Sequence, residues 1–170
     1  MDLKHPVVYG HPLHAMLSDL PATLIPTALL AAAAERIRPT DETRFAARSA
    51  SALAVTAALV AGAVGWWDWL FVPNEHPARR PATIHGLLNT AGLGLGALAL
   101  LKPRRRLELL IGLNAVLFVA AWIGGDLVFR LGWRVRPAEE LEQIEQGKSP
   151  AEARAVIDKH EREDLLLSFR

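Results

Sequence analysis

The sequence contains no cysteine among its 170 residues. This absence excludes disulfides, thiolate metal ligands and a cysteine nucleophile, and it leaves the redox compartment undecided. Net charge is also nearly absent, at +1, so no overall positive field favours binding to nucleic acid. We therefore expect no nucleic-acid partner.

Common catalytic motifs are missing as well. The chain has no phosphate-binding glycine loop before a helix, no HExxH and no GxSxG. We assign no catalytic residue, and an enzymatic role is left open but not favoured. A transporter would need helices broken near the middle of the membrane, and only Pro21 and Pro26 hint at such breaks.

Charged residues are distributed unevenly along the chain. Four blocks, at about 12–34, 49–71, 82–101 and 108–130, are almost free of charge, while the segments between them are crowded with it. Roughly 20 apolar residues cross a bilayer core of about 30 Å, whereas a soluble helix would carry charge on one face. Because the connections are short, the sequence predicts an all-α integral membrane protein, an up-down-up-down four-helix bundle.

The C-terminal part has a different composition, rich in charged and helix-favouring residues. Gly147 and Pro150 interrupt it, so we predict two short helices outside the membrane, with Pro150 opening the second. The chain thus divides into a four-transmembrane-helix domain, residues 1–136, and a charged helical tail, residues 137–170. The final "LLLSF" stretch could fold back against the bundle or the lipid surface.

Basic residues favour one orientation in the membrane. The first and third connections hold more of them than the opposite side, so these loops are predicted to be cytoplasmic and both termini extracytoplasmic. The basic C-terminal flank argues against this orientation. The basic residues of the two loops are Arg36, Arg38, Arg44, Arg48, Lys102, Arg104, Arg105 and Arg106.

Histidine and aspartate gather at the opposite ends of the same helices. His14 lies at the start of the first predicted helix and His85 at the start of the third, while Asp68 and Asp126 end the second and fourth. In an antiparallel bundle these four ends share one membrane surface. Ionisable groups are costly against lipid, so we expect His14 and His85 to face inward, close together at one depth.

The two halves of the chain also resemble each other. "HAMLSDL", from His14, is similar to "HGLLNTA", from His85, and "DWLF", from Asp68, is similar to "DLVF", from Asp126. Each half reads as a helix that opens with histidine, a basic loop, and a helix that closes with aspartate. Two such hairpins would be related by an axis along the membrane normal.

Three segments, "GHPLHAMLSDLPATL", "IHGLLNTAG" and "WIGGDLVFRLGWRV", resemble the DUF2231 family of predicted bacterial four-helix membrane proteins. The likeness covers about residues 8–136, and Phe129, Arg130 and Gly132 fit the aromatic-Arg-x-Gly ending of the family's last motif. It implies a multi-pass protein of the bacterial inner (cytoplasmic) membrane. Some relatives carry a Rieske-type iron–sulfur domain, which implies an electron-transfer setting for those members. This chain has no cysteine and no such domain, which weakens that implication here.

One functional hypothesis is a cofactor site. His14 and His85, and more weakly His11, could bind the iron of haem b or another transition metal through neutral imidazole nitrogens. Acceptors in a second layer would then fix each ring's tautomer. The candidates for that layer are Asp19, Asp68, Asn89 and Asp126.

The alternative, equally plausible, is that no cofactor binds. His85 and Asn89 would then hydrogen-bond across the bundle, and Asp126 would pair with Arg130 four residues later. The chain would be a non-catalytic membrane assembly subunit whose histidines support helix packing. Beyond the lipid bilayer, the expected partners are a second copy of the chain or a membrane redox partner.

Overall fold

The structure, a computed structural model, describes residues 4–9 and 11–167, with side chains except for 136–138 and 160–167. These residues form six α-helices, two short helical turns and three very short strands. The all-α prediction is confirmed. The tail histidine, His160, has its side chain outside the described residues.

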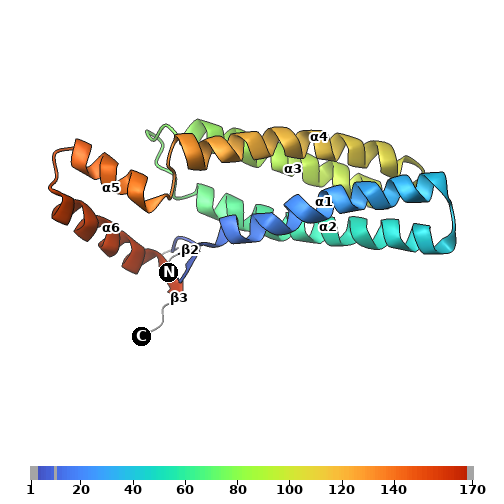
Figure 1. Cartoon of the computed structure of the whole chain (residues 1–170), viewed down its shortest axis with the longest axis horizontal. Helices are drawn as coiled ribbons and strands as arrows, with labels where there is room; N and C mark the ends of the chain where they lie inside the picture. The colour runs from blue at the N-terminus through green and yellow to red at the C-terminus, as the bar shows by residue number, and fades with distance from the viewer. Residues whose placement is uncertain (1–3, 10, 168–170) are drawn as a thin grey trace.

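Four long helices make up most of the molecule. Among the described residues, four segments are long and apolar enough to cross a membrane. Figure 1 shows them lying lengthwise, with the α1–α2 and α3–α4 turns at one end and the α2–α3 connection at the other. They are α1 (Leu13–Ile37), α2 (Asp41–Trp69), α3 (Arg79–Leu101) and α4 (Arg106–Gly125), the last preceded by the 3₁₀ turn η1 (Pro103–Arg105) and continued by the π-helical turn η2 (Asp126–Arg130).

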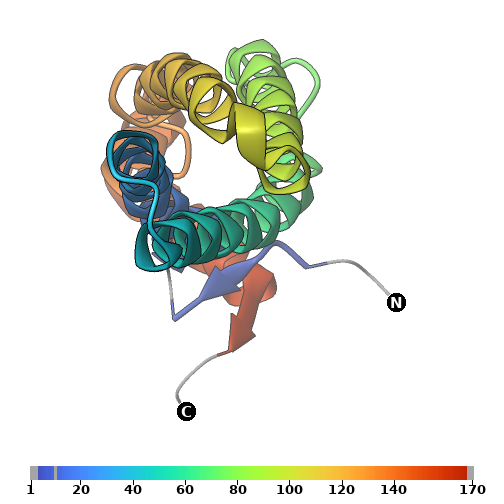
Figure 2. The same ribbon diagram turned by 90° about the vertical axis from the view of Figure 1, so that its right-hand side faces the viewer.

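The helices are arranged as two hairpins. Viewed along the bundle, α1, α2, α3 and α4 follow one another around a ring, so each packs against two neighbours (Figure 2). The contacts are most extensive between α1 and α2 and between α3 and α4. This pairing matches the division into halves that the repeated motifs predict.

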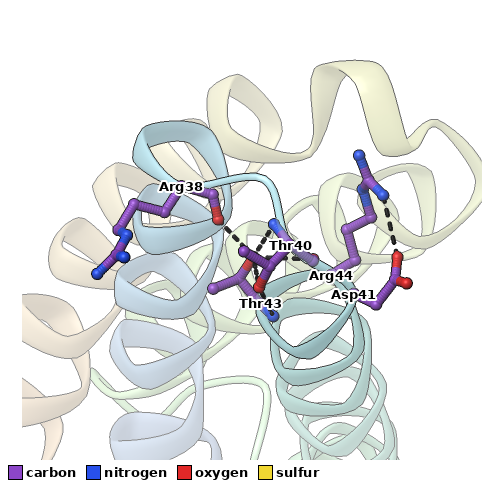
Figure 3. Close-up of polar contacts among 5 residues, drawn as sticks. All are labelled: Arg38, Thr40, Asp41, Thr43 and Arg44. Carbon is purple, nitrogen blue, oxygen red and sulfur yellow. Dashed lines mark hydrogen bonds and ion pairs between the residues drawn. The ribbon is translucent and has the colours of Figure 1, made fainter.

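The α1–α2 turn is much shorter than the predicted loop, because α2 begins at Asp41 and not near residue 49. Thr40 caps the helix: its Oγ1 accepts from the backbone N of Thr43 at 3.3 Å, and its own N donates to Thr43 Oγ1 at 3.0 Å (Figure 3). Thr43 Oγ1 also donates to the Arg38 carbonyl at 2.6 Å. This capping box starts the helix within a charged stretch that has no apolar periodicity.

A buried ion pair joins α1 to α4 at the same end. Arg106 Nη1 donates to Glu35 Oε2 at 2.6 Å, and the Arg106 side chain is only 5% exposed. Removing one partner of such a pair leaves an uncompensated charge, which is strongly destabilising. Arg106 is therefore an inter-helix contact as well as a loop charge.

The core of the bundle is built from small side chains. Ala28, Ala54 and Ala99 are almost completely buried, together with the larger Leu110. Small residues let helix backbones approach closely, which is the usual packing mode of membrane helices. Gly96 also lies inside: a Cβ added there would be 2.9 Å from Cγ2 of Val55.

The N-terminal segment and the tail meet at the other end. Strand β1 (Val7–Val8) pairs antiparallel with β2 (His11–Pro12) and parallel with β3 (Leu165–Leu167). The tail forms α5 (Arg136–Glu145) and α6 (Pro150–Asp164), the two predicted helices, which extend beyond the bundle (Figure 1). The small sheet was not predicted.

Replacing Gly96 with leucine is expected to destabilise the protein by about 1–3 kcal/mol, because the side chain would overpack the contact with Val55. Gly94 provides the matched control, since a Cβ there meets nothing within 4 Å. Thermal unfolding in detergent should show a clear loss for Gly96→Leu and none for Gly94→Leu. Equal stability of the two variants would mean that Gly96 does not face the interior.

Candidate functional site

His14 and His85 lie side by side within the bundle. Their ring centroids are 6.2 Å apart and the ring planes are inclined at 78°. His14 lies in the first turn of α1 and His85 in the second turn of α3, and both are half-buried. The predicted proximity of the two rings is therefore confirmed, while any role in binding stays a prediction.

Both rings are anchored in the same way. Nδ1 of His14 donates to the carbonyl of Ala61 on α2 at 3.1 Å, and Nδ1 of His85 donates to the carbonyl of Ala120 on α4 at 2.8 Å. A carbonyl can only accept, so Nδ1 carries the proton in each neutral ring and Nε2 keeps a lone pair. The two imidazoles therefore share one tautomer.

A glycine stands against each ring, one helical turn after the acceptor carbonyl. A Cβ added at Gly65 would lie 2.7 Å from Cε1 of His14, and one added at Gly124 would lie 3.0 Å from Cε1 of His85. Each hairpin thus contributes one histidine and one Ala-x-x-x-Gly face that receives it. The internal repeat extends from sequence motifs to individual contacts.

Asn89 makes the two halves unequal. Its Nδ2 donates to the carbonyl of His85 at 2.9 Å and lies 3.1 Å from Nε2 of the same ring. The carbonyl contact identifies this atom as the amide nitrogen, so its second proton can reach the Nε2 lone pair. Within the part of the chain that the structure describes, Nε2 of His14 has no such donor.

The aspartates do not take the predicted supporting role, because main-chain carbonyls fill it. Asp126 pairs with Arg130 at 2.8 Å, as the alternative interpretation expects. Asp19 is exposed, on a different face of α1 from His14. His11 is exposed in β2, outside the pair. Among the described residues, no group of three or more His, Asp or Glu side chains could hold a metal ion.

Asp68 is paired with His5, a histidine that the sequence analysis did not single out. Nε2 of His5 contacts Asp68 Oδ1, and the fully buried His5 ring meets Phe71 edge-on at 5.1 Å between centroids. The contact ties the N-terminal segment to the end of α2. One signal was present: His5 precedes Pro6 just as His11 precedes Pro12.

Comparisons with protein-family models, curated proteins and solved structures gave no match. The resemblance to the DUF2231 family therefore rests on the three motifs alone. The geometry defines the site: two imidazoles from different hairpins lie 6.2 Å apart between centroids, each held by a main-chain carbonyl through Nδ1, and Nε2 of His85 also lies 3.1 Å from the Asn89 amide nitrogen.

Replacing Gly65 with alanine is expected to displace the His14 ring and destabilise the protein by about 1–3 kcal/mol, as overpacking does. Gly62→Ala is the control on the same helix, because a Cβ at Gly62 meets nothing within 4 Å. Alanine favours a helix over glycine by about 1 kcal/mol, so the control should be neutral or more stable. Unfolding in detergent measures both, and a Gly65→Ala protein as stable as the control would contradict the contact.

Proposed function

We propose that this chain is an integral membrane protein of the DUF2231 type, crossing the bacterial inner membrane four times in up-down-up-down order. The distribution of apolar side chains supports insertion: Leu30, Phe118 and Trp122 are each 72% exposed, while the core is mostly alanine. Large apolar side chains are exposed along all four long helices, whereas soluble monomers rarely expose large continuous apolar patches. Lipid would cover them.

In the proposed orientation both termini, the small sheet and the α5–α6 tail are extracytoplasmic. The charge distribution supports it, since the arginine-rich turns lie at the end of the bundle away from these segments. The paired histidines then lie near the extracytoplasmic surface.

The proposed activity is binding of a transition-metal centre by His14 and His85, in a subunit associated with a membrane redox partner. One observation carries it: both rings have Nδ1 fixed by a carbonyl, with their centroids 6.2 Å apart. Metal-binding histidines are commonly oriented by such a bond from the other ring nitrogen, which keeps Nε2 available. A centroid separation of 6.2 Å is within the span of two imidazoles that share one ion through metal–nitrogen bonds of about 2 Å each.

A bare ion suits this site better than haem. A single ion needs little movement of the helices, whereas a porphyrin would require them to part around the two rings. Imidazole ligands suit zinc, copper, iron and nickel. The remaining ligands would be water or groups from the partner, because the described residues offer no third His or carboxylate there.

The second candidate function is helix packing alone. It is favoured by the fit of each ring over a glycine and by its bond to a carbonyl on the neighbouring helix. In that case the protein is a non-catalytic assembly subunit. Its two imidazoles stabilise the packing of α1 on α2 and of α3 on α4. The two candidates differ in whether a metal accompanies the protein.

Metal analysis of the purified full-length protein, with its visible spectrum, tests the proposal. We expect about one transition-metal ion per chain and its loss in both His14→Ala and His85→Ala. His11→Ala should retain it, since His11 is exposed and outside the pair. A Soret band would identify the centre as haem. Wild-type protein without metal or haem, even after incubation with Zn²⁺ or Cu²⁺, would leave only the packing function.

Orientation is tested with single cysteines, for which this cysteine-free chain is a clean background. Pro39, in the α1–α2 turn, and Asn74, in the α2–α3 connection, are both exposed. In spheroplasts a membrane-impermeant maleimide should label Asn74→Cys and not Pro39→Cys. The reverse pattern would invert the topology. Pro39 is preferable to Thr40, which caps α2.

A further inference from the structure

The two imidazoles differ in the state of their metal-binding nitrogen. Nε2 of His85 lies 3.1 Å from the amide nitrogen of Asn89, whereas no partner for Nε2 of His14 is found among the described residues. A nitrogen that accepts a hydrogen bond cannot use the same lone pair for a metal. Any ion entering the site therefore competes with Asn89 for His85.

The bond from Asn89 is well determined by its surroundings. Its Nδ2 is only 2.9 Å from the carbonyl of His85, so the amide must present its donor side. The carbonyl of Ala120 accepts from Nδ1 on the other side of the ring, at 2.8 Å. Both contacts require the same tautomer of His85, and they hold the ring between α3 and α4.

We propose that Asn89 gates the paired-histidine site. An ion first meets Nε2 of His14, and His85 becomes its second ligand only when the Asn89 amide turns away. Asn89 thereby lowers the affinity and makes the ion exchangeable, which suits transfer to or from a partner. This inference rests on the metal-binding function proposed above.

Asn114 provides a matched control for the test. Its Nδ2 donates to the carbonyl of Leu110, four residues earlier on α4, at 2.8 Å, as Asn89 does to His85 on α3. Both side chains are half-buried. Asn114→Leu therefore removes the same kind of intrahelical bond without releasing an imidazole.

The experiment is a titration of the detergent-solubilised full chain with Co²⁺, whose visible absorption reports nitrogen ligands, with Zn²⁺ as a competitor. Asn89→Leu should bind Co²⁺ roughly 2- to 10-fold more tightly than wild type, the factor expected for removing one competing hydrogen bond. Asn114→Leu should bind like wild type. His85→Ala and the His85→Ala/Asn89→Leu double variant should both fail to bind Co²⁺, since the gate acts only through His85.

The outcomes separate the two proposals. If wild type binds Co²⁺ and Asn89→Leu binds it equally or more weakly, the gate is wrong while the metal site stands. If only Asn89→Leu binds, the gate is supported in a stronger form. If neither binds, the metal-binding function fails and the gate falls with it. Unfolding curves of the two leucine variants check that both are folded.

Discussion

The placement of both histidine rings depends on one constraint, the absence of a side chain on the helix that faces each imidazole. The end of the bundle that contains His14 and His85 is called the histidine end below. Gly65 and Gly124 leave room for the rings of His14 and His85, and any Cβ there would meet ring atoms at 2.7–3.0 Å. The acceptor carbonyls lie one turn earlier, so the space and the hydrogen bond come from the same helix face. Each polar ring is thereby kept inside the bundle and hydrogen-bonded, which the proposed membrane location requires because exposure to lipid would be costly.

The two ends of the bundle are held by different chemistry. At the α1–α2 turn, the Arg106–Glu35 pair joins the two hairpins. At the histidine end, Arg79 donates from Nη1 to the carbonyls of Trp69 and Val72, both at 2.8 Å, and stacks over the Trp69 ring at 3.6 Å. These hydrogen bonds satisfy carbonyls at and just after the C-terminus of α2 and hold the connection to α3 in place. Positive charge is concentrated at the end that holds the α1–α2 and α3–α4 turns, whereas the inward-facing histidines lie at the opposite end. The proposed orientation is based on this difference in charge.

Hydropathy was sufficient to place the four long helices and the two tail helices, because lipid-length apolar blocks and helix-breaking residues such as Gly147 and Pro150 are local signals. The start of α2 was missed because it depends on a capping box, Thr40 with Thr43, inside a charged stretch. Local sequence also gave no sign of the pairing between β1 and β3, which come from opposite ends of the chain.

The matched depth of the two helix starts and the cost of exposing histidine to lipid are sufficient to predict, from the sequence, that His14 and His85 lie close together. The supporting groups were misassigned to aspartates because side chains are visible in a sequence, whereas every residue carries a main-chain carbonyl. Asp68 is instead engaged by His5, and the acceptors are Ala61 and Ala120. Only the packing of α1 on α2 and of α3 on α4 selects those two carbonyls.

X-ray absorption spectroscopy at the metal edge of the loaded wild-type protein tests the central claim most directly. Loaded wild type is predicted to show two imidazole nitrogens at about 2.0–2.1 Å from Zn²⁺, one from each hairpin, and His85→Ala is predicted to retain no bound metal. A first shell of oxygen atoms alone, unchanged by that substitution, would contradict a site built on the paired histidines.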